Sequence, residues 1–249
     1  IAVGVLTNKP LIVASEWLER FLYRHADRLK VNSPGYIEHV RNLGAKRIEL
    51  VPNGADVRMF DSVRRADAQA GASSAKSPYR VLYAGAHGMS NDLGVVLDAA
   101  KLLEGEPVEI ILLGDGKEKP NLQARAEELA LTNVTFLPSV PKSEMAAALH
   151  EADACLAILK PIEMYKTTYP NKVFDYMAAA KPVVLAIDGV VREVVDAAGC
   201  GVFAQPGDPQ ALADAIRVLQ RDPAHSQKMG QAGRAYIEEH FDRTALAEK

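Results

Sequence analysis

The feature that most constrains this chain is a regular alternation of short apolar runs and amphipathic segments between residues 79 and 219. Apolar runs such as VEIILL and PVVLAI lack polar–apolar alternation, which indicates strands covered on both faces. Segments with helical periodicity separate them. Repeated strand and helix units predict right-handed crossovers, and therefore an α/β fold with a Rossmann-like, doubly wound parallel sheet.

Residues 61–76, DSVRRADAQAGASSAK, interrupt this pattern because they are rich in Ala, Ser and charge without a hydrophobic period. We interpret them as a linker. Before the linker, the segment SEWLERFLYRHADRL predicts an amphipathic helix with Trp17 and Phe21 on one stripe and arginines beside it. Such a helix suits either the cover of a sheet, which we favour, or a membrane surface.

Composition excludes several classes of protein. The net charge of −3 gives no basic excess of the kind that nucleic-acid binding needs. No apolar run reaches the ~18 residues that a membrane-spanning helix requires, and no signal peptide is visible. Cys155 and Cys200 lie in apolar settings, so we expect buried thiols, no disulfide framework and a reducing, cytoplasmic compartment. Because the chain begins at Ile1 without a methionine, we interpret it as a piece of a longer protein.

Two glycine loops are candidates for a phosphate site. Ligands of a doubly wound sheet bind beyond the carboxyl ends of the strands, where GAHG follows YRVLYA and GDGKEK follows VEIILL. Glycine lets a ligand approach the backbone closely, and a strand that leads through glycines into a helix suits a diphosphate. The candidates are Gly85, His87, Gly88, Gly114, Asp115, Gly116 and Lys117. His87 could instead be an ordinary turn residue, and neither loop matches the NAD or P-loop pattern.

The long loop KPIEMYKTTYPNK leads into a predicted helix that starts near Pro170 or Asn171 and ends before Pro182. Lys172 would supply a positive charge for a phosphate, and Asp175 could accept hydrogen bonds from a ribose diol. The alternative is that Lys172 and Asp175 form a solvated pair, since they lie three residues apart on the helix. No cluster has the spacing of a metal site.

Seven segments, in this order, resemble glycosyltransferase family 4 (group 1), in its bacterial surface-polysaccharide branch, and cover nearly the whole chain. They are VPNGADVRMF, LYAGAHG, LLGDGKEKPNL, NVTFLPSVPKSEM, PNKVFDYMAAAKPVV, AGCGVFAQPGDPQALADAI and MGQAGRAYIEEHF. The resemblance implies a GT-B fold, with the C-terminal Rossmann-like domain and a partial second one. It assigns residues 1–60 to a remnant of the N-terminal acceptor domain and 77–219 to the nucleotide-sugar donor domain. Residues 220–249 would be helices that return to the N-terminal domain.

The resemblance implies a glycosyltransferase, retaining and metal-independent, that uses a nucleotide-diphosphate sugar, with UDP favoured. The acceptor would be a growing cell-surface glycan or a lipid-linked molecule, on or near the inner face of the cytoplasmic membrane, with no nucleic acid involved. Asp175 would hold the ribose, Lys172 would face the diphosphate beside Asn171, and the Gly114–Gly116 turn would lie near the donor. The backbone of Val140 would contact the base.

Four departures from the family pattern concern the donor site. Asp175 replaces a usual glutamate, and Thr167 stands where the first glutamate of the pair is expected, so a hydroxyl of Thr167 or Thr168 would have to substitute for it. Ala180 replaces a usual glycine. The loop after the first strand also lacks the Arg and Lys pair that many relatives place on the diphosphate.

The catalytic residue cannot be assigned, because the resemblance places it in the preceding part of the N-terminal domain. Two other functions fit the same pattern. One is a nucleotide-sugar 2-epimerase of the same fold, and the other is a non-catalytic nucleotide-binding module.

Overall fold

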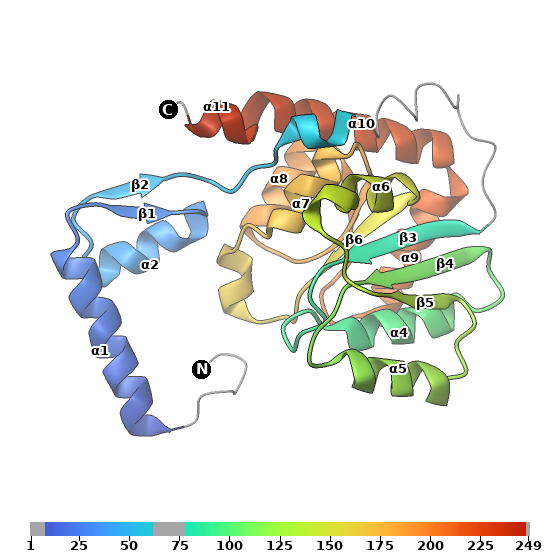
Figure 1. Cartoon of the computed structure of the whole chain (residues 1–249), viewed down its shortest axis with the longest axis horizontal. Coiled ribbons are helices and arrows are strands. Elements are labelled where there is room, and N and C mark those ends of the chain that lie inside the picture. The colour runs from blue at the N-terminus through green and yellow to red at the C-terminus, as the bar shows by residue number, and fades with distance from the viewer. Residues whose placement is uncertain (1–7, 62–77, 248–249) are drawn as a thin grey trace.

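The structure is a computed structural model that describes residues 8–61 and 78–247, so the predicted linker lies outside the described residues except for Asp61. Six parallel strands form the main sheet in the order β5-β4-β3-β6-β7-β8 (Figure 1). Their bounds are β3 Tyr79–Ala84, β4 Val108–Leu113, β5 Val134–Leu137, β6 Ala154–Ile158, β7 Val183–Ala186 and β8 Gly201–Phe203. This is the Rossmann order, which reverses direction between β3 and β6. The predicted doubly wound sheet is confirmed.

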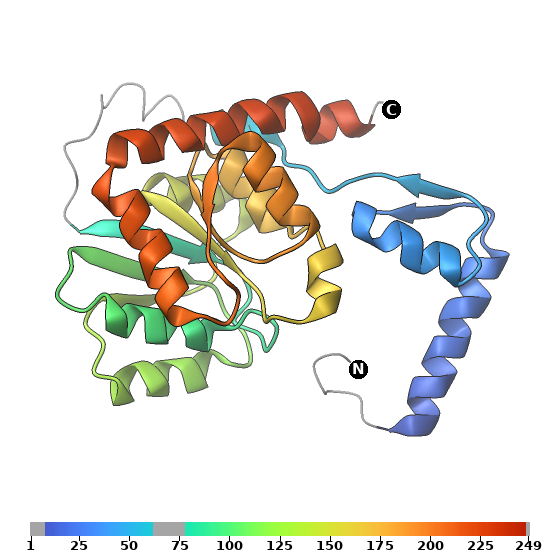
Figure 2. The same ribbon diagram turned by 180° about the vertical axis from the view of Figure 1, so that it is seen from behind.

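Helices cover both faces of this sheet, as Figures 1 and 2 show from opposite sides. One core contains side chains of α4 (Leu93–Leu102), α5 (Lys119–Glu128) and α9 (Pro209–Arg221). The other core contains side chains of α6, α7, α8 and α10. The bounds of these four are α6 Met145–His150, α7 Asn171–Ala178, α8 Val190–Ala198 and α10 Pro223–His240.

The central strands are buried along their whole length, as their uninterrupted apolar runs predict. Every residue of β6 and of β7 is buried. Cys155 and Cys200 are both buried and free, and burial raises the pKa of each thiol to about 12. The predicted structural thiols are therefore confirmed, and both are poor nucleophiles.

A smaller unit precedes the sheet. Its two short strands, β1 Leu29–Val31 and β2 Ile48–Leu50, pair in parallel. The helical segments around them are α1 Lys9–His25, η1 Pro34–Tyr36, α2 Ile37–Asn42 and η2 Val57–Phe60. Parallel pairing of two strands joined by a helical crossover is the minimal unit of a Rossmann-like sheet.

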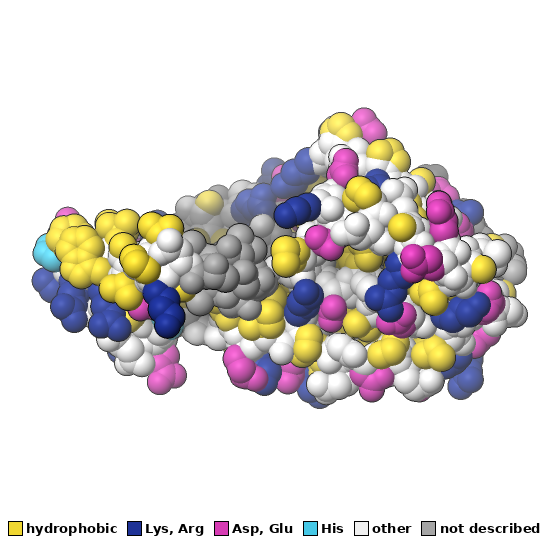
Figure 3. All heavy atoms as spheres, turned by 90° about the horizontal axis from the view of Figure 1, so that it is seen from below, with side chains coloured by type: hydrophobic (Ala, Val, Ile, Leu, Met, Phe, Trp, Pro, Cys, Tyr) yellow, Lys and Arg dark blue, Asp and Glu magenta, His cyan; other side chains and the backbone are white. Residues whose placement is uncertain are grey.

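Helix α1 differs from our expectation. It was expected to cover a sheet, but it has no buried residue, and Trp17 is 64% exposed. Figure 3 shows its apolar side chains at one end of the molecule, flanked by Lys and Arg side chains. Within the described residues α1 therefore covers no sheet, and its role as the cover of a sheet in the longer protein stays a prediction. Amphipathic periodicity indicates that one face of a helix is apolar, but it does not specify what packs against that face.

The C-terminal segment packs against the segment that leads out of the smaller unit. The backbone N–H of Ala55 donates to Phe241 O, and Arg243 N–H donates to Ala55 O. In α10, Arg234 is only 6% exposed and donates to Val57 O, Ala178 O and the carboxylate of Asp61. These bonds attach residues 54–61 to α10 and to the C-terminal end of α7. The last described helix is α11, Arg243–Ala247.

Candidate functional site

The two glycine loops pack against each other at the reversal of strand order. His87 N–H donates to Asp115 O at 2.8 Å, and Glu118 N–H donates to His87 O at 3.0 Å. A Cβ atom on Gly114 would overlap Gly85 O, and one on Gly116 would lie 2.5 Å from His87 O. Close packing against the loop after β3 therefore requires glycine at both glycine positions of GDG. We had expected these glycines to let a ligand approach the backbone. A Cβ on Gly88 would meet nothing closer than 3.8 Å, so Gly88 is open to a ligand.

His87 lies beneath these loops rather than at their surface. Its side chain is fully buried, between the rings of Tyr83 and Phe136, and neither ring nitrogen has a hydrogen-bond partner. Burial lowers the pKa of His87, and the charges of Lys119 and Lys172 lower it further, so the imidazole is neutral near pH 7. Its backbone joins the two loops, whereas a contact of its ring with a phosphate or sugar stays a prediction.

Lys172 reaches from the first turn of α7 to the loop after β3. Its Nζ lies 4.0 Å from the centroid of the Tyr83 ring and 3.5 Å from Asn91 Oδ1. A Cβ on Gly85 would lie 2.8 Å from that Nζ. Burial lowers the pKa of Lys172 to about 7. An amine thus stands at the loop in which the Arg and Lys pair of many relatives is missing.

Asp175 lies one turn after Lys172 on α7, but the two side chains point to different surroundings. Burial raises the pKa of Asp175, and the charges of Lys142 and Arg243 oppose that rise. The Lys172 amine instead lies over the Tyr83 ring and 3.5 Å from Asn91 Oδ1, so it points away from solvent and toward the loop after β3. The alternative of a solvated Lys172–Asp175 pair is therefore wrong. The cations that act on the Asp175 carboxylate are Lys142, which follows β5, and Arg243, at the start of α11.

The start of α7 lies beside this arrangement. Pro170 occupies the N-cap position without a side-chain cap, and Asn171 is exposed at the first helical position. The first backbone N–H groups of a helix have no partner within it, so this end can receive an anion. Asn171 and Lys172 thus place free N–H groups and an amine at the same end of α7.

Thr167 and Thr168 use their hydroxyl groups within the protein. Thr167 Oγ1 donates to Met164 O at 2.6 Å, and Thr168 Oγ1 lies 3.0 Å from Tyr36 Oη. Ser33 Oγ donates to Thr167 O. The smaller unit therefore contacts the loop in which we expected a hydroxyl to replace the missing glutamate. That replacement stays a prediction. It requires the hydroxyl of Thr167 or of Thr168 to give up its present hydrogen bond and to bind the donor sugar instead.

The remaining candidates differ in their positions. Lys117 is exposed, whereas Lys119 donates to Gly114 O at 2.7 Å and to Leu137 O at 2.9 Å, tying the loops after β4 and β5 together. Val140 is half-buried and packs against the core beside α6. Asp115 is exposed, and its Oδ1 accepts from Gly116 N–H.

The sequence did not indicate that Lys119 binds two loops at the site, nor that the charge of Lys142 acts on Asp175. A lysine side chain spans four methylene groups, so its sequence position does not reveal which loop its amine reaches. The spacing of Lys119 from the GDG turn was the only signal available for it.

Within residues 8–61 and 78–247, no three His, Cys, Asp or Glu side chains gather as metal ligands, so metal independence stays a prediction. In the same ranges, no helix combines the length and apolarity needed to cross a bilayer.

The strand order, the helix layers and the candidate site at the reversal define the Rossmann-like C-terminal half of a GT-B glycosyltransferase fold. Solved structures agree. Sucrose-phosphate synthase from Thermosynechococcus elongatus aligns over 98% of this chain and 62% of its own, with a TM-score of 0.79 and 21% identity. Anabaena HepE, solved with UDP-glucose, aligns over 94% of this chain and 66% of its own, with a TM-score of 0.77 and 19% identity.

The chain belongs to the group 1 glycosyltransferase family, because residues 78–222 match the family described as "Glycosyl transferases group 1". Among curated relatives, the lipopolysaccharide core biosynthesis glycosyltransferase LpsD of Rhizobium meliloti is 26% identical over 91% of this chain and 63% of its own length. The chain spans about half the length of other curated relatives that it matches, 50% of one and 54% of another.

Proposed function

We propose that the parent protein transfers a sugar from a nucleoside-diphosphate sugar, with UDP-sugars favoured, to a growing cell-surface glycan or lipid-linked acceptor. The observation that carries this proposal is the position of the Lys172 amine. It lies at Gly85, beside the start of α7, at the reversal of strand order. In a doubly wound sheet this is the crevice in which ligands bind.

Each proposed contact uses a group with matching chemistry. The N–H groups at the start of α7 and the Lys172 amine would stabilise the negative charge that develops on the departing diphosphate. The open Gly88 would admit a phosphate to the backbone of the first loop. Asp175, a carboxylate one turn further along α7, would accept hydrogen bonds from the ribose diol, and the Val140 backbone would pair with the base.

The comparisons support the substrate class. HepE is described in complex with UDP and glucose and with UDP-glucose, and LpsD by its role in lipopolysaccharide core biosynthesis. Retention of configuration and independence of metal remain parts of the proposal. A lipid-linked acceptor would place the parent enzyme on the inner face of the cytoplasmic membrane.

Calorimetric titration of this chain with UDP, GDP and ADP tests the nucleotide site. We expect one diphosphate, UDP, to bind, and Lys172→Ala to weaken its binding about tenfold or more, because a charge-assisted bond to phosphate is lost. Lys101→Ala is the matched control, since Lys101 lies on α4 in a surface pair with Glu104. Equal affinity in Lys172→Ala and Lys101→Ala would remove Lys172 from the site.

Asp175→Ala tests the ribose contact in the same titration. We expect weaker UDP binding and a loss of the preference for UDP over 2′-deoxy-UDP, because the carboxylate that would accept from the diol is gone. An unchanged preference would contradict the ribose role. If the unsubstituted chain binds none of the three diphosphates, the donor site as a whole is contradicted.

A further inference from the structure

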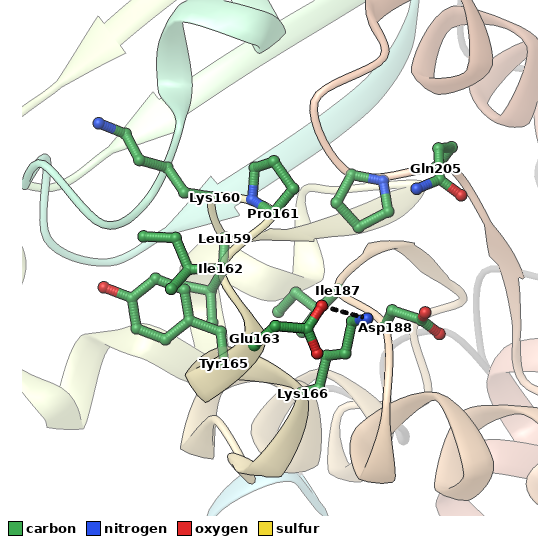
Figure 4. Close-up of a pocket in the computed structure, with 11 residues that line it drawn as sticks. Leu159, Lys160, Pro161, Ile162, Glu163, Tyr165, Lys166, Ile187, Asp188 and Gln205 are labelled. Atoms are coloured by element: carbon green, nitrogen blue, oxygen red, sulfur yellow. Dashed lines mark hydrogen bonds and ion pairs between the residues drawn. The ribbon is translucent and has the colours of Figure 1, made fainter. Parts of the chain in front are cut away.

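The first part of the segment between β6 and α7 is held by the sheet domain. This part is a short 3-10 helix, η4 Glu163–Thr167. Tyr165 Oη donates to Ser90 Oγ in the loop after β3 at 2.6 Å. A Cβ on Gly189, in the turn after β7, would overlap the carbonyl oxygen of Lys166. Figure 4 shows the side chains of Tyr165 and Lys166 on different sides of the segment, so neighbouring loops of the sheet domain contact it from two directions.

The second part of the segment is bound by the smaller unit. Ser33 Oγ donates to Thr167 O, and Asn53 Nδ2 donates to Tyr169 O at 2.6 Å. Ser33 is fully buried, and Tyr169 is only 9% exposed. Two side chains of the smaller unit thus bind two backbone carbonyls within the three residues that precede Pro170.

Pro170 makes this part of the segment depend on donors from elsewhere. A proline has no backbone N–H and favours an extended conformation in the residue before it, so hydrogen bonds cannot run on from η4 into α7. Pro170 itself is extended, with a φ of −68° and a ψ of 123°. Helix α7 then opens with a bond from Val173 N–H to Pro170 O at 3.1 Å. Whatever holds Tyr169 therefore also orients the first turn of α7.

The first turn of α7 carries the groups of the proposed phosphate site. The N–H groups of Asn171 and Lys172 have no acceptor within the helix, and the Lys172 amine reaches Gly85. A hydrogen bond weakens steeply as its angle departs from linear, so a small rotation of this turn would weaken the contacts to an anion. The bond from Asn53 to Tyr169 O therefore acts on this site through the backbone.

We propose that Asn53 and Ser33 are positioning residues of the nucleotide site, which hold the start of α7 through the carbonyl groups of Tyr169 and Thr167. The part of that helix start in phosphate binding rests on the proposed function. Because both side chains belong to the smaller unit, a displacement of that unit changes nucleotide affinity. The coupling is reciprocal, so a bound nucleotide stabilises the contact of the smaller unit by the same factor.

Amide hydrogen exchange of the full chain tests whether these bonds hold the start of α7, with Val173 N–H as the reporter. We expect Asn53→Ala to speed its exchange about fivefold, the effect of losing one neutral hydrogen bond. Ser33→Ala should act in the same direction. Asn53→Asp keeps the size of the side chain but replaces the donating NH₂ group by an oxygen, so it should speed exchange at least as much. A side chain that only fills space would leave exchange unchanged in Asn53→Asp.

Asn133→Ala is the matched control. Asn133 Nδ2 also donates to a backbone carbonyl, that of Ala100, at 2.9 Å. Asn133 precedes β5 and so lies at the opposite end of that strand from the loops of the site. We expect Val173 to exchange in this variant as in the unsubstituted chain. Equal exchange of Val173 in Asn53→Ala and Asn133→Ala would overturn the proposal.

Calorimetric titration with UDP measures the consequence for binding. We expect Asn53→Ala to bind UDP about fivefold more weakly than Asn133→Ala. In the unsubstituted chain, UDP should slow the exchange of Val51 N–H, which donates to Val31 O in the smaller unit at 2.9 Å, and Asn53→Ala should reduce this effect.

The two measurements separate this proposal from the proposed function. Faster exchange of Val173 with unchanged UDP affinity would show that Asn53 does not position the nucleotide site. If the unsubstituted chain binds no UDP, the proposed function fails, whereas exchange of Val173 still decides whether Asn53 holds the start of α7.

Discussion

At the residue scale, the buried position of Lys172 changes the protonation of its amine. Burial lowers its pKa to about 7, so roughly half of the empty protein holds a neutral amine near that pH. A diphosphate favours the ammonium form and would raise this pKa on binding. The residue therefore couples phosphate binding to proton uptake, which an exposed lysine with an ordinary pKa would not do.

The first prediction follows from the sign of that coupling. Above about pH 7, UDP must bind together with a proton, so its affinity should fall by up to about tenfold per pH unit, and this contribution should vanish below pH 7. Calorimetry in buffers of different ionisation enthalpy measures the proton uptake. Lys172→Gln should abolish the uptake, and an uptake that persists in this variant would assign it to another group.

Ala180 gives a second residue-scale prediction. Helix α7 ends in a Schellman motif, with Lys181 N–H donating to Tyr176 O and Ala180 N–H donating to Met177 O. This geometry gives Ala180 a φ of +56°, which an L side chain adopts at a cost. Ala180→Gly should raise the free energy of unfolding by about 1 kcal/mol in urea titration. Ala179→Gly, at the preceding position with a φ of −78°, should not.

At the scale of elements, α10 binds the C-terminal end of α7 through one buried arginine. The guanidinium of Arg234 donates to Ala178 O at 2.6 Å and to Val57 O at 2.9 Å, and it pairs with Asp61 and Glu238. Removing it would leave buried carbonyl groups without their donor. Arg234 therefore supports the element that carries Lys172 and Asp175.

We predict that Arg234→Ala lowers the free energy of unfolding by about 3 kcal/mol in urea titration. Arg192→Ala is the comparison, because the Arg192 side chain is 40% exposed and exposed pairs contribute little. Its loss should cost less than about 1 kcal/mol. Similar losses in the two variants would show that the buried bonds of Arg234 add nothing beyond an ordinary surface pair.

At the scale of the whole molecule, the smaller unit meets the sheet domain at the loop before α7. Gly35 packs so closely there that a Cβ would lie 2.5 Å from Thr167 Cα. Gly35→Val should displace η1 and speed amide hydrogen exchange in β1 and β2, while the unfolding of the six-stranded domain changes by less than about 0.5 kcal/mol. Unchanged exchange in those strands would show that this contact does not hold the two units together.

Sequence alone predicted the architecture well, because continuous apolar runs such as PVVLAI leave few alternatives to a buried parallel strand. It also identified Lys172 as a charged residue beside a loop. It could not predict that the amine reaches Gly85, nor that the GDG glycines serve loop packing, because both depend on contacts between distant segments. The exposure of α1 in this chain could not be predicted either, since its apolar stripe carries no information about a partner.

The hydrogen bond between Arg234 and Val57 joins residues that are 177 positions apart in the chain. During synthesis on the ribosome, the segment around Val57 emerges long before the residue that fastens it. Contacts of such long range form slowly, because a large loop must close first. The nascent chain therefore carries residues 54–61 without this bond until α10 has left the exit tunnel.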